Sequence, residues 1–473
     1  MNSISFYGAV SEVTGSRIVV SSWKDQVMLD CGQFQGHRDE SYLKNKAFFD
    51  NDNITDYVIL SHSHLDHAGM LPALYKQGYN GKVFCTPPTK DLANYMLPDA
   101  VKVMEKDLPI VAKMIARHGG KQSNVDMLFD ASDVSGILSK FVDVPYLQET
   151  KLTDELSFKL IDNCHILGSA SVKLTVDQKG TKHKVWYTSD LGHDHSILSR
   201  NPVIPQDITH LIIETTYGNK DRSTIDPVQQ ILDSVVQTYR RGGKSIIPAF
   251  SVHRMQTIIL ILHKLYRENA MPDIPIYIDS PLGNKVTGLY SKYKDELNEE
   301  TIKYFTDQGF DPFNFPNLKY VTEMEMTTAV SKSDEPCIIV SASGMCEGGR
   351  VVEYLKDNIS NPLNHVLLVG YTARGTLGRR LLDGRHKEVT INGLKVSNKC
   401  QTSYIEGFSA HADIEYILDY IDKASENSNI KNIFLIHGEE DSVKNVKRRL
   451  NDKGYNNIVI PVKGKSYKLS QQH

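Results

Sequence analysis

The sequence predicts an α/β protein in which a two-layer β-sheet core, with helices outside it, is interrupted by a second α/β domain that contains a parallel sheet. Three observations predict this arrangement. Residues up to about 218 form two β-rich stretches with few crossover helices. Strands and helices alternate between 219 and 401, and a histidine-rich loop followed by helices and strands comes after 402. We therefore predict one domain at 1–218 plus 402–473 and an inserted domain at 219–401.

The elements of the first domain follow from the spacing of its apolar residues. Short apolar or alternating runs predict strands at 16–21, 26–30, 56–60, 156–160, 171–176, 184–188 and 210–214. A helical repeat of apolar residues predicts helices at 69–77 and 91–118. After 402, the same patterns predict helices at 414–424 and 442–453 and strands at 432–436 and 458–462.

The inserted domain shows a different pattern, in which single strands alternate with helices. Strands are predicted at 244–248, 274–279, 337–341 and 365–370. Helices are predicted between them at 227–240, 251–268 and near 349–357. This alternation is typical of βαβ units and therefore of a parallel sheet.

Composition excludes several classes of protein. The net charge of −3 predicts no broadly basic surface, so nucleic-acid binding would have to depend on a local site. Six cysteines without a CxxC pair argue against a disulfide scaffold and against a thiolate zinc site. No apolar run approaches the roughly 18 residues of a membrane span, and the first ten residues lack the features of a secretion signal. We expect a cytoplasmic protein without membrane attachment.

The strongest chemical signal is the stretch SHSHLDHAG at 61–69, directly after an apolar strand. In an extended chain, residues two apart face the same way, so His62 and His64 can hold one metal ion together. Asp66 and His67 lie where the chain bends into a helix and can point to a second ion. Imidazole and carboxylate ligands together suit zinc, and this density of ligand-type residues argues against an ordinary solvated loop.

The HxHxDH pattern resembles the signature of the metallo-β-lactamase superfamily. The resemblance implies further metal ligands at strand ends, and two candidates match. His165 lies in NCHILGSA, and Asp190 lies in YTSDLG at the position that bridges two cations in this family. Asp30, in LDCG, matches the first motif and would orient a ligand or loop from behind, although an Asp before Gly is also typical of a turn.

Within that superfamily the chain resembles the β-CASP branch, which processes nucleic acids. Glu214 in IIETTYG, His411 in GFSAHAD and His437 in LIHGEE match motifs A, B and C of the branch. Between motifs A and B, the stretches PAFSVHR, DSPL, SGM, GGR and GTLGR are also similar to the branch. The resemblance covers nearly the whole chain and implies an αββα sandwich with an inserted β-CASP domain.

The resemblance also implies a mechanism. His62, His64 and His165 would hold one zinc ion, Asp66, His67 and His437 a second, and Asp190 would bridge them, so that Asp66 and Asp190 also count as catalytic residues. The two ions would activate a water for attack on a phosphodiester. His411, oriented by Glu214, would protonate the leaving group. A histidine at motif C favours single-stranded RNA as substrate, cut internally and potentially also from a 5′ end.

Contacts to the substrate phosphates are expected from a set of Gly- and Arg-rich or hydroxyl-bearing positions, namely Ser343, Arg350, Arg374 and Ser409. Ordinary turn chemistry explains the same stretches equally well. Two other functions stay open: a small-molecule or DNA-directed metallo-hydrolase on the same fold, and an inactive RNA-binding subunit. Every expected metal-ligand position carries a ligand-type residue, which argues against the inactive subunit. The long segment between motifs A and B argues against a small substrate. A homodimer is one assembly that the sequence allows.

Overall fold

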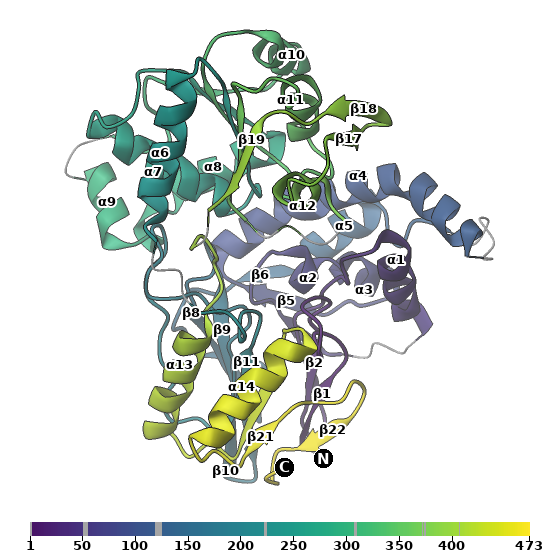
Figure 1. Ribbon diagram of the computed structural model, residues 1–473. Coiled ribbons are helices and arrows are strands. Elements are labelled where there is room, and N and C mark those ends of the chain that lie inside the picture. Colours follow the sequence, from purple (N-terminus) through teal and green to yellow (C-terminus); the bar gives the residue numbers. More distant parts are fainter. Residues whose placement is uncertain are drawn as a thin grey trace. The chain divides into compact units, whose positions relative to one another are not determined.

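The computed structural model describes residues 2–50, 55–118, 125–221, 225–306, 310–370, 372, 375–405 and 407–473. Contacts between Cα atoms divide the chain into two compact units. The first unit comprises Met1–Ser196, Asn201–Asp221 and Ala410–His473, and the second comprises Ile197–Arg200 and Arg222–Ser409. The second unit is therefore inserted, in sequence, between two parts of the first (Figure 1).

The first unit is built on two seven-stranded sheets. The order of the first sheet is β22 (Ser466–Lys468), β1 (Ser3–Phe6), β2 (Ile18–Ser21), β3 (Gln26–Leu29), β4 (Tyr57–Ile59), β5 (Lys82–Cys85) and β6 (Phe141–Asp143). The order of the second is β21 (Ile458–Val459), β20 (Asn432–Ile436), β11 (His210–Glu214), β10 (Thr181–Tyr187), β9 (Ala170–Gln178), β8 (Leu156–Asp162) and β7 (Thr150–Lys151). Because β1 pairs with β22, both ends of the chain belong to the first sheet.

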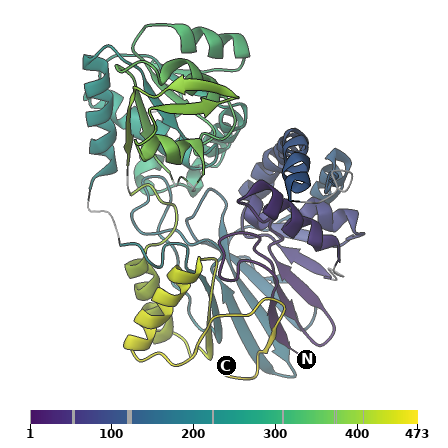
Figure 2. The ribbon, with the colours of Figure 1, turned by 45° about the vertical axis from the view of Figure 1, so that its right-hand side comes forward.

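Helices lie outside both sheets of the first unit. The first sheet is accompanied by α1 (Arg38–Lys46), the 3-10 helix η1 (Ala47–Asp50), α2 (Leu65–Ala68), α3 (Leu71–Lys76), α4 (Pro87–Arg117) and α5 (Ala131–Leu138). The second is accompanied by α13 (Ile414–Glu426) and α14 (Glu440–Asp452). Figure 2 shows these helices on the two outer sides of the paired sheets.

Three apolar cores hold the four layers of the first unit together. The central core joins the sheets, with Ile18 and Val20 of β2 packed in the same cluster as Phe158 and Leu160 of β8. A second core joins the first sheet to α3, α4 and α5, and a third joins β11 and β20 to α13 and α14. Alternate residues of β8 are buried, whereas all of β11 and β20 is buried because both faces of these parallel strands are covered. The predicted αββα sandwich is confirmed.

The second unit contains a six-stranded parallel sheet. Its order is β14 (Leu318–Tyr320), β13 (Ile276–Asp279), β15 (Ile338–Ser341), β12 (Ser245–Pro248), β16 (His365–Leu368) and β19 (Gln401–Tyr404). A hairpin of β17 (Glu388–Ile391) and β18 (Leu394–Ser397) is separate from it. The helices are α6 (Pro227–Arg240), α7 (Arg254–Arg267), α8 (Pro281–Lys292), the 3-10 helix η3 (Lys294–Glu296), α9 (Glu299–Thr306), α10 (Met324–Lys332), α11 (Val351–Asn358) and α12 (Leu377–Leu382).

Two boundaries differ from the sequence prediction. Residue 402, where we expected the chain to re-enter the first domain, lies within β19, which pairs with β16 in the sheet of the second unit. The first unit resumes at Ala410, because the backbone pairing of β19 holds the chain to the second unit until then. The long helix α4 begins at Pro87, four residues before the predicted start, because Thr86 accepts a hydrogen bond from the Thr89 N–H and caps it.

A search of the helices in the described part of the chain finds none with the length and apolar character needed to cross a membrane.

Candidate metal centre

The ligand-type residues of the first unit come from strand ends that meet at one edge of the two sheets. β8 and β10 both run antiparallel to β9, and β11 and β20 run parallel to β10. Their carboxyl ends therefore lie at the same edge of the second sheet. His165 follows β8, Asp190 follows β10, Glu214 ends β11 and His437 follows β20. The histidine-rich loop follows β4 in the facing sheet, and Ser61 O accepts a hydrogen bond from Ala170 N–H (2.9 Å) across the gap.

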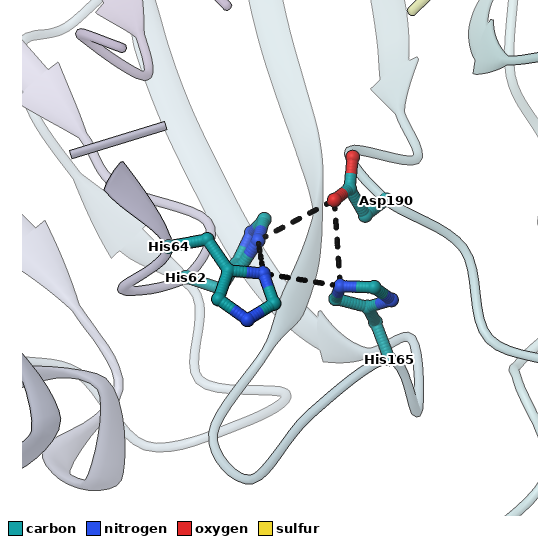
Figure 3. Close-up of side chains that lie close together, drawn as sticks. All are labelled: His62, His64, His165 and Asp190. Carbon is teal, nitrogen blue, oxygen red and sulfur yellow. Dashed lines mark hydrogen bonds and ion pairs between the residues drawn. The ribbon is translucent and has the colours of Figure 1, made fainter. Parts of the chain in front are cut away.

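One group of side chains consists of His62, His64, His165 and Asp190 (Figure 3). His64 Nδ1 lies 3.1 Å from His62 Nε2 and 3.3 Å from His165 Nε2. Asp190 Oδ2 lies 3.6 Å from His62 Nε2 and 3.4 Å from His165 Nε2. Three imidazole nitrogens and one carboxylate oxygen thus converge from three separate loops.

A second group consists of Asp66, His67, His437 and, again, Asp190. The Nε2 atoms of His67 and His437 are 3.2 Å apart, and Asp66 Oδ2 lies 3.6 Å from His437 Nε2. Asp190 Oδ1 lies 3.0 Å from His67 Nε2 and 3.4 Å from His437 Nδ1. The two oxygens of Asp190 therefore face different groups, Oδ2 the first and Oδ1 the second.

Two candidate ligands, His165 and His67, are held at Nδ1 by an acceptor outside their metal group. The Nδ1–H of His165 donates to Ala410 O (3.2 Å). The Nδ1–H of His67 donates to Asp30 Oδ2 (2.7 Å). A histidine whose Nδ1 is held in this way presents Nε2 to a metal, which is the arrangement typical of metal-ligating histidines.

The residues present fit a metal ion. Asp190 is almost fully buried, and its Oδ1 has no hydrogen-bond partner among the described residues, although two imidazoles lie within 3.4 Å. A buried carboxylate oxygen without a donor is costly, and a cation between the oxygen and the imidazoles removes that cost. Imidazole with carboxylate is a donor set of zinc and of other transition metals.

The protonation states at the centre favour metal binding. Burial lowers the pKa of His62 and His165 well below the usual value, so both rings are neutral at pH 7. Burial would raise the pKa of Asp190, but the surrounding histidines, His437 first, hold it well below its usual value. Burial likewise opposes a charge on His67, yet the Asp190 and Asp30 carboxylates raise the pKa of that ring well above its usual value. The first group therefore has neutral imidazoles beside an ionised carboxylate, and the raised pKa of His67 in the second group shows that the two carboxylates favour a positive charge there.

Asp30 supports the centre from behind. Its Oδ1 accepts from the Ser61 N–H (2.7 Å), and its Oδ2 accepts from the Ser61 hydroxyl (2.8 Å), the Tyr187 hydroxyl (2.7 Å) and His67 Nδ1–H. Tyr187 ends β10 in the other sheet, so this fully buried carboxylate connects the two sheets. Tyr187 was not assigned a role from the sequence, because 157 positions separate it from Asp30.

We expect Asp30→Asn to lower the metal affinity of the protein by about 10- to 100-fold, as for other residues that orient ligating histidines. An amide at this position loses one acceptor, and its NH₂ opposes the Nδ1–H of His67. Metal affinity measured by competition with a chelator checks this. Asp279→Asn is the matched control, since Asp279 is an equally buried aspartate in the second unit. Equal metal affinity in Asp30→Asn and the wild type would contradict the role.

Tight backbone turns after the strands orient the candidate metal ligands toward the centre. Asp30, Ser189 and His437 have positive φ angles of 60°, 55° and 49°, and each lies one or two residues beyond a strand end. This conformation costs about 1–3 kcal/mol for residues other than glycine and is concentrated at functional sites. Gly32 permits another close approach, because a Cβ there would lie 1.6 Å from the Asp66 carbonyl oxygen.

Asn163 connects the loops that carry His165 and Asp190. Its Nδ2 donates to Thr188 O and to Asp190 O, both at 2.8 Å, and its own carbonyl accepts from the Gly192 N–H (2.9 Å). Asn163 precedes His165 by two residues, so one side chain fixes the spacing of two candidate ligands. The sequence offers one signal for this residue, because an Asn that follows a strand is typical of a loop whose backbone its side chain holds.

His411 and Glu214 form a pair beside the metal groups. The Nδ1–H of His411 donates to Glu214 Oε1 at 2.9 Å, and Oε2 lies 3.1 Å away. Glu214 is fully buried and also accepts from the Leu191 N–H (2.6 Å), whereas the His411 side chain is 21% exposed. Burial opposes a charge on His411, but the Glu214 and Asp190 carboxylates outweigh it and raise the pKa of the ring to about 9. A protonated, partly exposed histidine next to a metal centre can act as a general acid.

The four positions expected to contact phosphate belong to the second unit. Arg350 is ion-paired with buried Asp279 (2.6 Å) and donates to Thr322 O (2.6 Å), so the fold occupies its guanidinium group. Ser343 donates to Gly348 O (3.3 Å), and Ser409 is half-buried. Arg374 lies outside the described residues. Phosphate binding by these residues stays a prediction.

Family models match three segments of the chain. The Metallo-beta-lactamase superfamily domain matches residues 21–205, the Beta-Casp domain 255–381, and the Zn-dependent metallo-hydrolase RNA specificity domain 395–461. The chain is 32% identical to Ribonuclease TTHA0252 of Thermus thermophilus over 92% of its own length and 93% of the relative. The chain belongs to the β-CASP branch of the metallo-β-lactamase superfamily. The fold of this family implies a bound metal, for which the His/Asp groups above are the candidate ligands.

Two further relatives and one solved structure match the chain over different shares of their own length. The RNase J-like protein of Methanocaldococcus jannaschii is 33% identical over 92% of both chains. Transcription termination factor FttA of Methanosarcina mazei is 30% identical over 92% of this chain but only 66% of its own length, so the chain spans about two thirds of that relative. The crystal structure of a protein of unknown function from Enterococcus faecalis V583 matches 98% of the chain and 99% of its own, with a TM-score of 0.53 and 12% identity, which shows a shared fold alone.

Proposed function

We propose that this β-CASP protein is a two-zinc ribonuclease that hydrolyses phosphodiester bonds of single-stranded RNA, and that it acts in the cytoplasm. The observation that carries the proposal is the position of Asp190, whose two oxygens face two different histidine groups. A carboxylate in this position can bridge two cations. Two-metal sites are typical of enzymes that cleave phosphate esters, including nucleases.

RNA is the favoured substrate on the strength of the relatives. Two of them, each covered over more than nine tenths of its length, are named as a ribonuclease and as RNase J-like. The model matching residues 395–461 is described as an RNA specificity domain, and this segment includes both His411 and His437. The net charge of −3 predicts no broadly basic surface, so the RNA backbone would have to bind at a local site, where bound cations add positive charge.

The chain's own residues have separate tasks in the proposed reaction. His62, His64 and His165 would hold one zinc ion, Asp66, His67 and His437 the other, and Asp190 both. When bound, the two cations polarise the phosphodiester and lower the pKa of a nearby water to about 7. His411 supplies the proton that the leaving oxygen needs, from Nε2, because Nδ1 is engaged by Glu214. Glu214 holds the ring in place and favours its protonated form.

The function is tested with purified, zinc-loaded protein and a single-stranded RNA labelled at its 5′ end or its 3′ end. We expect cleavage of the RNA and slower or no cleavage of DNA of the same sequence. The sizes of the labelled products separate internal cuts from cuts that start at the 5′ end. An enzyme that hydrolyses a small ester or cuts DNA but leaves RNA intact would contradict the proposal.

A further inference from the structure

An exposed aromatic ring lies at the carboxyl edge of the parallel sheet in the second unit. Phe250 comes two residues after β12 ends at Pro248, and it is 37% exposed. We propose that this ring is a platform on which an unpaired base of the RNA substrate stacks. The proposal rests on the ribonuclease function proposed above and adds a base-binding subsite to it.

Phe250 lies at a position in the sheet where α/β proteins bind ligands. β12 is flanked by β15 and β16. From β12 the chain goes on to β13, on the β15 side, whereas from β16 it goes on to β19, on the opposite side of the sheet. The winding of the sheet therefore reverses between β12 and β16. In open α/β sheets, ligands bind beyond the carboxyl ends of the strands at such a reversal.

One edge of the Phe250 ring lies close to two glycines. A Cβ on Gly344, which follows β15, would lie 3.0 Å from Cδ2 and Cε2 of Phe250. A Cβ on Gly370, which follows β16, would lie 3.2 Å from the same Cε2 atom. The segments that follow both neighbouring strands thus bring glycine backbone close to one edge of the Phe250 ring. Any side chain at either glycine would be crowded. One edge of the ring therefore lies close to the backbone after both neighbouring strands, while the residue as a whole is 37% exposed.

The groups near Phe250 suit a nucleotide. Ser251, the next residue, has its Oγ 3.1 Å from the Oγ of Ser280, the N-cap residue that precedes α8. A nucleobase offers a flat face for stacking on an apolar ring, and the sugar and base edges offer partners for hydroxyl groups. Stacking tolerates every base, since each has a π face, so we expect little dependence on base identity.

A second exposed aromatic residue of the same unit provides a control. Tyr239 is 44% exposed and lies in the last turn of α6, which leads to the amino end of β12. It is therefore at the edge of the sheet opposite Phe250. Tyr239→Ala removes as much exposed aromatic surface as Phe250→Ala but touches no proposed subsite.

The test measures KM and kcat for cleavage of a set of single-stranded RNAs, each with one nucleotide replaced by an abasic residue. A stacked base contributes about 5- to 150-fold in affinity. We expect Phe250→Ala and Phe250→Leu to raise KM for intact RNA by that factor, and Phe250→Tyr and Tyr239→Ala to keep the wild-type KM. In the wild type, one abasic position should raise KM by the same factor. That position should have no further effect in Phe250→Ala, because the interaction is already lost.

The outcomes separate this inference from the function on which it rests. Wild-type protein that cleaves RNA while Phe250→Ala keeps the wild-type KM contradicts the platform alone. An abasic scan with the same profile in Phe250→Ala and the wild type also contradicts it, even if the variant has a raised KM from altered folding. Zinc-loaded wild-type protein that cleaves no RNA contradicts the proposed function and, with it, the platform.

Discussion

Replacing His411 by alanine is expected to lower the rate of RNA hydrolysis by about 10²–10⁴-fold while leaving the bound metal in place. The factor is that of a general acid, because the alkoxide leaving group of a phosphodiester is a poor one until it is protonated. His411 is placed for this task by Glu214, 2.9 Å from its Nδ1, and its side chain is more exposed than those of the histidines aimed at Asp190. Cleavage rate and zinc content are measured on the same preparation.

A substrate with an acidic leaving group separates proton transfer from structural damage. A nitrophenyl phosphodiester needs little protonation, so the deficit of His411→Ala should shrink with it. The matched variant is His437→Ala, which should lose both zinc and activity, because His437 Nε2 lies 3.2 Å from His67 Nε2 within the second metal group. A His411→Ala enzyme that cuts RNA at a near-normal rate, or that loses as much zinc as His437→Ala, would contradict the assignment.

The pH profile gives Glu214 a separate test. A general acid must be protonated, so the rate falls as the pH rises through the pKa of His411. Glu214 is the nearest group that raises this pKa. Glu214→Gln removes that effect, so the alkaline limb of the profile should move to lower pH, with a smaller loss of rate than in His411→Ala. A limb that stays in place in Glu214→Gln would show that the titrating group is not His411.

Replacing Asp190 by alanine is expected to empty both metal positions and to reduce RNA hydrolysis to the background rate. One oxygen of Asp190 lies 3.4–3.6 Å from the Nε2 atoms of His165 and His62, and the other lies 3.0 Å from His67 Nε2. Removal of the carboxylate withdraws a ligand from each group and leaves the buried His67 ring without one of its two counter-charges. Bound zinc should fall well below one per chain, measured by elemental analysis after dialysis.

Two further variants are controls for the zinc content and rate of Asp190→Ala. Asp194→Ala, at an exposed aspartate four residues further on, should keep the wild-type zinc content and rate. His165→Ala should lose zinc from one position only, because its Nε2 belongs to the first group alone. Retention of one tightly bound zinc in Asp190→Ala, as in His165→Ala, would mean that Asp190 does not bridge.

The sequence alone predicts those residues of the candidate site that lie close together along the chain. His62, His64, Asp66 and His67 fall within six residues at the end of β4, so their proximity follows from chain connectivity and from the alternation of an extended segment. Strands such as β11 and β20 were predicted with the observed bounds, because they are continuous apolar runs that end at a polar residue. Their partners in the sheet were not predictable from such runs.

Contacts between distant residues explain what the sequence did not reveal. Tyr187 donates to Asp30 across the two sheets, and Asn163 connects two ligand loops, and neither contact leaves a periodic signal. The sequence predicts a return to the first domain at residue 402, within β19, because nothing in residues 401–404 distinguishes pairing with β16 from pairing elsewhere. Arg350 pairs with buried Asp279 of another βα unit, a contact that the sequence did not indicate, and its expected role at a phosphate stays a prediction. The resemblance to the metallo-β-lactamase superfamily assigned His165 and Asp190 to the site. The resemblance to its β-CASP branch added Glu214, His411 and His437, which spacing alone could not assign to the site.

The central claim, a centre of two metal ions that cleaves RNA, is tested most directly by a zinc titration of metal-free protein. Bound zinc per chain and the rate of RNA hydrolysis are measured in the same samples. We predict that the rate stays low until the second zinc per chain binds and that it reaches its maximum at two. Full activity with one zinc per chain, or with none, would contradict the account.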